Sequence, residues 1–187
     1  MELSGDRRLP QLEYLGDATQ FAARLHAMVP DSPLFENLNL AEIRLMSHFM
    51  QVYRAQAGQE VIREGDSGDF LMFVIEGRIE VFRQDRAGSP RLIAVVEAGK
   101  TLGEMSMIDG EPRFATCVAD GASLIGVLTR ESLARIILEQ PILGAKILME
   151  LVLMLSQRLR QTSSRLLAAL ENERGPAGVA DGGTGFV

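Results

Sequence analysis

FLMFVIEGRIEVFR, the stretch at residues 70–83, indicates two short β-strands joined by a tight turn. Two apolar runs flank Glu76-Gly77, and glycine is a residue that turns favour. In the second run Ile79 and Val81 fall on one face of the strand, because successive side chains of a strand point to opposite faces. The pair therefore predicts a barrel wall with one face turned inward.

Similar apolar runs precede and follow this stretch, and turn residues such as Gly, Asp and Pro separate them. The predicted strands are Val52–Ala57, Glu60–Arg63, Phe70–Ile75, Arg78–Arg83, Leu92–Val96, Phe114–Ala119 and Ser123–Leu128. Short strands at such spacing imply an antiparallel sandwich or jelly-roll barrel. We predict a mainly β protein with flanking helices: a double-stranded β-helix (jelly-roll) barrel followed by a long C-terminal helix.

The region before the barrel lacks this strand pattern. Residues 1–30 are predicted to be a loosely attached leader that is partly helical. Asp17 is placed to cap a short helix with apolar side chains on one face. A second, amphipathic helix is expected at Ala41–Met50, just before the first predicted strand. The barrel with its flanking helices is assigned to residues 31–140.

After the last predicted strand the period becomes helical again. Thr129 suits the N-cap of a helix that reaches Glu139, and Pro141 suits the first turn of another that extends to about Glu173. We assign the C-terminal helix to residues 141–173. The Gly-rich end at 174–187 is expected to be disordered.

The C-terminal helix carries a heptad seam, in which residues alternate in spacings of four and three. The seam comprises Leu148, Val152, Leu155, Leu159, Thr162, Leu166 and Ala169. An apolar stripe of this kind needs cover, and we predict a homodimer joined along residues 148–166. The alternative is that the stripe folds back on the barrel.

Composition excludes several classes of protein. A net charge of −6 and a pI near 5.0 argue against a broad nucleic-acid footprint, which would need clustered Lys and Arg. The lone Cys117, in an apolar run, is expected to be buried and inert, and rules out a disulfide framework within one chain. The most apolar stretch, Ile142–Leu155, contains Lys146 and Glu150 and is too short to cross a bilayer. With no signal-peptide pattern at the N-terminus, we expect a cytoplasmic location and no membrane partner.

One stretch breaks the barrel pattern: LGEMSMIDGEPRFAT, residues 102–116. It leaves room for one short helix, about Glu104–Ile108, between two strands. Gly103 lets the backbone approach a ligand, and the first amides of the helix suit a phosphate. Arg113 offers a two-pronged, charge-assisted contact to the same phosphate. The carboxylate of Glu104 would be repelled there, so a neighbouring sugar hydroxyl is its natural donor.

A plainer explanation of these residues exists. A Gly-Glu pair at a strand end is common, and Glu104 with Arg113 could form an ordinary surface ion pair. The complete string in a strand–helix–strand setting favours the phosphate site.

The two ends of this string, Gly103-Glu104-Met105-Ser106 and Pro112-Arg113-Phe114-Ala115-Thr116, resemble the phosphate-binding cassette of the cyclic-nucleotide-binding domain family. That family includes bacterial catabolite activator proteins, regulatory subunits of cAMP-dependent protein kinase and nucleotide-gated channels. The resemblance covers about residues 32 to 165. It implies a ligand rather than a cofactor: cAMP, with cGMP as the second candidate.

The resemblance also implies roles. Glu104 would hold the ribose 2′-hydroxyl, Arg113 and the amides of Met105 and Ala115 would hold the cyclic phosphate, and Val81 would line the sugar or base. Thr162 and Ser163 correspond to the part of the activator helix that reaches adenine, one helical turn farther along than expected. The predicted ligand-binding residues are Gly103, Glu104, Met105, Ser106, Arg113, Phe114, Ala115, Val81, Thr162 and Ser163.

Phe114 departs from the family pattern, which has Ala, Ser or Thr at this position. Because Phe114 has no hydrogen-bonding group, it could not meet the exocyclic amine of guanine. We therefore expect cAMP to be preferred over cGMP. Because the ring is bulky, an alternative is a degenerate domain that keeps the barrel, binds no nucleotide and serves only protein interaction.

An enzyme is not expected. Metal-dependent barrel enzymes need His and carboxylate ligands inside the barrel, whereas His26 and His48 both fall in predicted N-terminal helices. A transcription regulator would need a helix-turn-helix after the C-terminal helix, so DNA binding by this chain alone is not expected, unless the sequence is a fragment. The prediction is a bacterial regulator that binds a cyclic nucleotide and signals through its C-terminal helix to an unidentified downstream protein.

Overall fold

The computed structural model describes residues 9–173 of the 187-residue chain. The predictions for the first eight residues and for the tail at 174–187 lie outside this range. The chain forms two compact units, which divide within the last helix, after Leu151. The barrel and the beginning of that helix make up the first unit.

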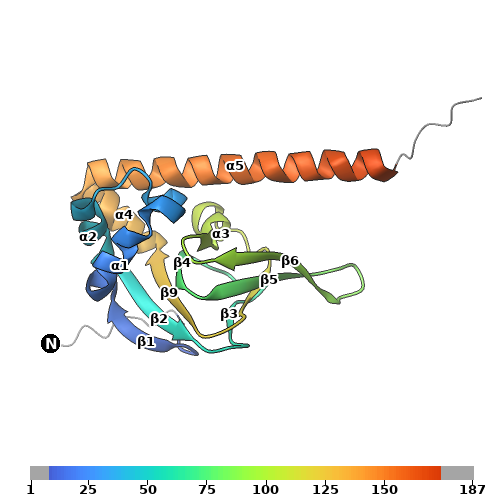
Figure 1. Ribbon diagram of the computed structural model, residues 1–187, viewed down its shortest axis with the longest axis horizontal. Coiled ribbons are helices and arrows are strands. Elements are labelled where there is room, and N and C mark those ends of the chain that lie inside the picture. Colours follow the sequence, from blue (N-terminus) through green and yellow to red (C-terminus); the bar gives the residue numbers. More distant parts are fainter. Residues whose placement is uncertain (1–8, 174–187) are drawn as a thin grey trace, which may run out of the picture. The chain divides into compact units, whose positions relative to one another are not determined.

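Two antiparallel sheets build the barrel, and their strands are visible in Figure 1. The first sheet has the order β1 (Glu13–Asp17), β2 (Met50–Ala55), β9 (Ser123–Thr129), β4 (Phe70–Glu76) and β7 (Thr101–Leu102). The second has the order β3 (Glu60–Ile62), β8 (Thr116–Ala119), β5 (Arg78–Gln84) and β6 (Pro90–Glu97). This arrangement confirms the predicted mainly β fold, and all seven predicted strands are present with shifts of a few residues at their ends.

Alternate side chains of the strands fill a common apolar core. Ile79 and Val81 of β5 belong to it, as the alternation predicted, and Met72 and Val74 of β4 pack in the same cluster. The intervening residues of β4 are buried too, because helical segments cover the other face of its sheet. Phe73 shows this directly, with its ring 4.6 Å from that of Phe35. Burial on both faces explains why β4 reads as one continuous apolar run.

The covering segments come from the N-terminal part of the chain. They are η1 (Ala18–Phe21), α1 (Ala22–Ala27), η2 (Val29–Asp31), η3 (Pro33–Phe35) and α2 (Leu40–Ser47). Figure 1 shows α1, α2 and α4 gathered at one end of the strands. The Asp17 side chain accepts a hydrogen bond from the Thr19 amide at 3.0 Å, so the predicted cap is confirmed, although the first turn is a 3-10 helix.

The prediction of a loosely attached leader is wrong for residues 9–30. β1 pairs with β2, and Leu9 and Leu12 lie in the apolar core at 4% and 6% exposure. The physical reason is that β1 is an edge strand with a register shift near Gly16, so its alternation is interrupted. The predicted helix at Ala41–Met50 was also too long, since α2 ends at Ser47 and Met50 begins β2.

Two helices follow the barrel, α4 (Arg130–Glu139) and α5 (Pro141–Glu173). The Thr129 hydroxyl accepts from the Ser132 amide at 3.0 Å, which confirms the predicted N-cap. The two helices pack closely where Gly144 faces Ile137, since a Cβ on Gly144 would lie 2.8 Å from the Ile137 Cα. Lys146 near the start of α5 bonds Glu42 of α2 at 2.7 Å, which ties this end of α5 to the N-terminal helices.

The second unit begins at Val152 and contains the remainder of α5. Seam residues Val152, Leu159 and Leu166 are 57%, 69% and 60% exposed in the single chain. Among the described helices, none has the length and apolar character needed to cross a membrane.

Candidate functional site

A six-residue helix, α3 (Glu104–Asp109), separates β7 from the segment that leads into β8. Gly103 and Gly110 bound it, and both have left-handed backbone conformations, with φ of 76° and 79°. Other residue types are strained in that region, so the two glycines fix the short length of the helix. The helix predicted at Glu104–Ile108 is thereby confirmed to within one residue.

Arg113 is the buried cation of this site, with 4% of its surface exposed. Its Nη1 donates to the Gly103 carbonyl at 2.8 Å and its Nη2 donates to the Phe70 carbonyl at 2.9 Å. The guanidinium carbon also lies 4.3 Å from the centre of the Phe70 ring. Burial lowers the pKa of Arg113 from its usual value, yet a guanidinium remains charged at neutral pH. A fixed positive charge therefore sits beside the start of α3.

Glycine at position 68 makes room for this side chain. A Cβ on Gly68 would lie 2.0 Å from the Arg113 Nε, and one on Gly103 would lie 2.4 Å from its Nη1. The loop that carries Gly68 is also hydrogen-bonded to the segment that contains Arg113, because the Arg113 amide donates to the Asp66 carbonyl at 2.8 Å. Sequence reasoning treated Gly68 only as a turn residue and missed Phe70 as a partner of Arg113.

Glu104 and Ser106 of α3 face inward, with exposures of 0% and 3%. Since Arg113 is buried as well, the explanation of Glu104 and Arg113 as a surface ion pair is wrong. Placing ionisable groups in the interior is costly, and such groups gather at functional sites. Val81 and Ala115 are buried in the adjoining core, so the structure brings these predicted residues into one region.

Phe114 and Met105 differ from the others, being 51% and 43% exposed. The Phe114 ring stacks against Arg83 of β5, whose guanidinium carbon is 3.7 Å from the ring centre. The Arg83 Nε is also 4.0 Å from a carboxylate oxygen of Glu64. Arg83 thus holds the ring by a cation–π contact, a partnership that sequence reasoning did not find.

Thr162 and Ser163 belong to the second unit and are exposed on α5. The Thr162 hydroxyl donates to the Arg158 carbonyl at 2.9 Å, a bond within the helix. Their predicted role at the ligand stays a prediction.

Arg130, the first residue of α4, binds the other end of α3. Its Nε donates to the Met107 carbonyl at 2.6 Å and its Nη2 to the Ser106 carbonyl at 2.9 Å. A cation at a helix C-terminus satisfies the last carbonyls and complements the helix dipole. Sequence reasoning missed this contact, because nothing near Arg130 in the sequence points to α3.

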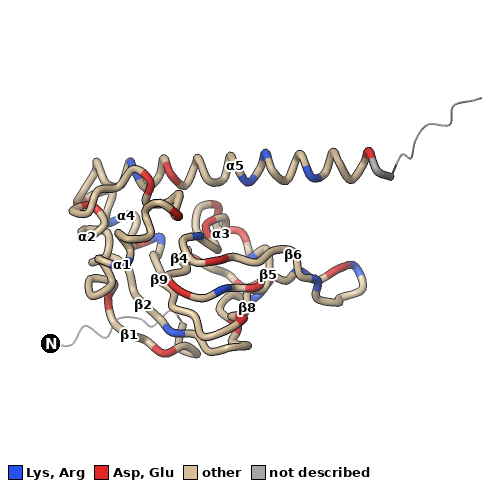
Figure 2. Tube along the Cα trace, in the orientation of Figure 1, with Lys and Arg blue, Asp and Glu red and all other residues tan. Residues whose placement is uncertain are grey.

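Other chemistry in the barrel is limited. Cys117 is buried in the core, as predicted, and burial raises the pKa of its thiol to about 12. The described residues contain no group of three or more His, Cys, Asp and Glu side chains that could hold a metal. Figure 2 shows basic and acidic positions interspersed along the described trace.

Comparison with known proteins settles the family. Residues 53–140 match the family described as "Cyclic nucleotide-binding domain". A crystal structure of a cyclic nucleotide-binding domain from Methylobacillus flagellatus is 34% identical, with a TM-score of 0.78 over 88% of this chain and 93% of that one. The chain belongs to the cyclic nucleotide-binding domain family. The sequence resemblance is thereby confirmed.

Relatives of this cyclic nucleotide-binding domain are named as a receptor and as regulatory subunits. The cyclic AMP receptor protein of Thermus thermophilus is 31% identical over 76% of this chain and 65% of its own length. A cAMP-dependent protein kinase regulatory subunit of Dictyostelium discoideum is 27% identical over 76% of this chain and 44% of its own length. The chain thus spans less than two thirds of these curated relatives.

Proposed function

We propose that this domain is a sensor which binds a cyclic nucleotide at the cassette, prefers cAMP over cGMP, and signals through its C-terminal helix to a downstream protein. The observation that carries the proposal is the buried guanidinium of Arg113, held by two carbonyl groups beside the start of α3. A buried cation with a fixed orientation suits an anionic group that is itself withdrawn from water.

The cyclic phosphate is the natural partner of Arg113. A guanidinium carries five N–H donors, and the bonds to Gly103 and Phe70 use two of them. The remaining donors can meet phosphate oxygens, together with the amides of Met105 and Ala115. Glu104 lies at the first turn of α3 and is assigned to the ribose 2′-hydroxyl, with Val81 along the sugar or base.

Removing Arg113 should therefore leave the phosphate charge poorly compensated. We expect Arg113→Ala to weaken cAMP binding by about 2–5 kcal/mol in isothermal titration calorimetry. Glu104→Gln should weaken it less, because the amide oxygen can still accept a hydrogen bond from the ribose. Arg78→Ala is the matched control, since Arg78 lies on β5 and pairs with Asp120 at the surface.

Because Arg113 also bonds two backbone carbonyls, its loss should lower the free energy of unfolding as well. Urea denaturation of each variant separates this loss of stability from the loss of binding. The variant Arg113→Lys keeps the positive charge but loses the planar guanidinium with its paired N–H donors. Unchanged affinity in a folded Arg113→Ala variant would remove the cassette assignment.

The base preference rests on Phe114. Its ring stacks against Arg83 and is half exposed, so the exposed part of the ring can contact the base of the nucleotide. A guanine amine placed against the ring would lose water without gaining a partner, at a cost of about 1–3 kcal/mol. Adenine lacks that amine, and its edge or face can contact the ring. Hydroxyl groups of Thr162 or Ser163 would add a bond to the adenine amine if they reach it.

A competition titration measures this preference. We expect cAMP to displace a bound fluorescent nucleotide at lower concentration than cGMP does. Phe114→Thr should reduce the difference in affinity between the two nucleotides, because it introduces a hydroxyl that can bond the guanine amine. Phe114→Leu is the control, since it keeps an apolar side chain and should not improve cGMP binding. Equal or tighter binding of cGMP by the wild type contradicts the preference.

Signalling through the C-terminal helix requires a connection between α3 and α4, and Arg130 supplies one. Arg130 is the first residue of α4, and its side chain binds the last carbonyls of α3. Helix α4 in turn packs closely on α5 where Gly144 faces Ile137. A shift of α3 on ligand binding would therefore change the position favoured for α4. Coupling of this kind needs a ligand that stabilises one arrangement over the other.

Arg130→Met should leave nucleotide binding largely intact and reduce this coupling. Amide hydrogen exchange of α4 and of residues 141–151 is the measurement, with and without saturating cAMP. We expect cAMP to change protection in the wild type and to change it less in Arg130→Met, with Arg135→Met on the exposed side of α4 as the control. An equal response in Arg130→Met would exclude this route.

A homodimer along residues 148–166 is proposed for the exposed seam of α5. The seam side chains leave apolar surface in water in a single chain, and a second copy of the helix would cover it. Light scattering of the full chain should give a dimer, and a monomer for the double variant Leu155→Asp, Leu159→Asp. The double variant Gln157→Asp, Gln161→Asp adds the same charge at outer heptad positions and should stay dimeric. A wild-type monomer would refute the dimer.

A further inference from the structure

The side chain of Phe114 is held less firmly than the backbone on either side of it. The Arg113 carbonyl before it accepts a hydrogen bond from the Gly65 amide at 2.9 Å. The Thr116 hydroxyl after it accepts one from the Glu64 amide at 3.0 Å. Phe114 itself is 51% exposed, so packing fixes only part of its side chain. Exposed side chains change rotamer within nanoseconds, and a further contact is needed to keep the ring in one orientation.

Arg83 supplies this contact from the rim of the barrel. Strand β5 places Ile79, Val81 and Arg83 on one face, because alternate side chains of a strand share a face. Val81 lies in the core, and Arg83 continues the same face toward the end of β5. There its guanidinium carbon lies 3.7 Å from the centre of the Phe114 ring. Because a cation is attracted to the face of an aromatic ring, Arg83 favours the orientation in which that face meets the guanidinium.

The guanidinium of Arg83 is itself anchored by Glu64. One carboxylate oxygen of Glu64 lies 4.0 Å from the Arg83 Nε, and the other accepts from the Gln84 amide at 3.0 Å. The side chains of Glu64 and Arg83 are 25% and 44% exposed, so water and salt screen the pair only in part. Since the Glu64 amide also bonds Thr116, a closed ring of contacts joins the loop before β4, the end of β5 and the segment that carries Phe114.

We propose that Arg83 is a positioning residue for the base: by holding the Phe114 ring, it sets the preference between cAMP and cGMP. The inference rests on the proposed binding of a cyclic nucleotide at the cassette. A ring held in one orientation meets the guanine amine in every complex, whereas a ring that is free to turn can move aside. Loss of Arg83 therefore reduces the preference while leaving the phosphate contacts of Arg113 in place.

Competition titrations of the full chain with cAMP and cGMP provide the test. The two nucleotides share the ribose and the cyclic phosphate, so the ratio of the cGMP Kd to the cAMP Kd reports the surroundings of the base, and a general loosening of the site cancels. We expect Arg83→Met to lower this ratio by about two- to fivefold, the factor that corresponds to an exposed cation–π contact. Arg83→Gln removes the same charge and should give the same shift. Urea denaturation of each variant confirms that folded chains are compared.

A double-mutant cycle tests whether Arg83 acts through Phe114. In a Phe114→Leu background the ring is absent, so Arg83→Met should leave the ratio unchanged there. A shift in that background as large as in the wild type would mean that Arg83 acts on the base by another route, and would overturn the proposal.

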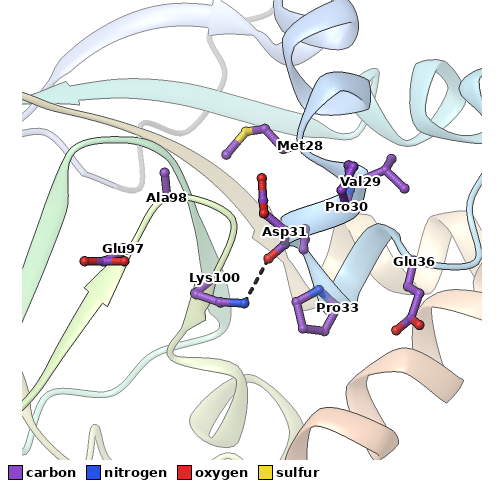
Figure 3. Close-up of a pocket in the computed structure, with 10 residues that line it drawn as sticks. Met28, Val29, Pro30, Asp31, Pro33, Glu36, Glu97, Ala98 and Lys100 are labelled. Atoms are coloured by element: carbon purple, nitrogen blue, oxygen red, sulfur yellow. Dashed lines mark hydrogen bonds between the residues drawn. The ribbon is translucent and has the colours of Figure 1, made fainter.

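Lys100→Met is the matched control for the loss of one positive charge. Lys100 lines a hollow of about 730 Å³ between the η2–η3 segment and the turn that joins β6 to β7 (Figure 3). Its ammonium donates to the Asp31 carbonyl at 2.9 Å, the dashed line in the figure. Neither Arg83 nor Phe114 lines this hollow, so Lys100→Met should leave the ratio unchanged. An equal shift in Lys100→Met and Arg83→Met would mean a general effect of charge and would contradict the proposal.

Failure of this inference is distinguishable from failure of the proposed function. An unchanged ratio in Arg83→Met, with cAMP still bound and Arg113→Ala still impaired, overturns the role of Arg83 and keeps the cassette. A wild type that binds neither nucleotide removes both. A wild type that binds cAMP without preferring it over cGMP removes the base preference and the role of Arg83 together.

Discussion

The burial of one guanidinium, that of Arg113, sets the requirements that the surrounding chain must meet. Moving a charge out of water is costly unless hydrogen bonds replace its hydration. The carbonyls of Gly103 and Phe70 supply those bonds, and the ring of Phe70 adds a cation–π contact. Glycine is required at 68 and 103 because a Cβ at either position would collide with the side chain. One buried charge thus ties together β4, the loop before it and the start of α3.

Burial of Arg113 also bears on the proposed binding of a phosphate by an acidic chain. A net charge of −6 repels phosphates at long range, so the attraction must come from a cation that is close and poorly screened. The buried guanidinium of Arg113 meets this requirement, because water and salt screen its charge less than they screen the charges of the surface carboxylates.

The short helix α3 occupies a central place in the proposed mechanism because both of its ends are held. Its first residues adjoin Arg113, and its last carbonyls are bound by Arg130 from α4. Six residues cannot absorb a displacement by bending, so movement at one end should reach the other. The close packing of α4 on α5 at Gly144 then extends the rigid connection to the start of the long helix.

Local patterns in the sequence determined much of this protein. Seven of the nine described strands, the caps at Asp17 and Thr129, the helix at Glu104 and the length of α5 all follow from short-range periodicity and capping chemistry. The cassette residues could be predicted for the same reason, because they are contiguous in the chain and share one strand–helix–strand unit.

Only the tertiary structure decided the contacts between distant segments. The edge strand β1, the packing of Gly68 against Arg113, the hold of Arg130 on α3 and the stacking of Arg83 on Phe114 join residues with no shared local pattern. The physical reason is that periodicity reports which face of an element is buried, whereas the partner that buries it is chosen by packing of the whole chain.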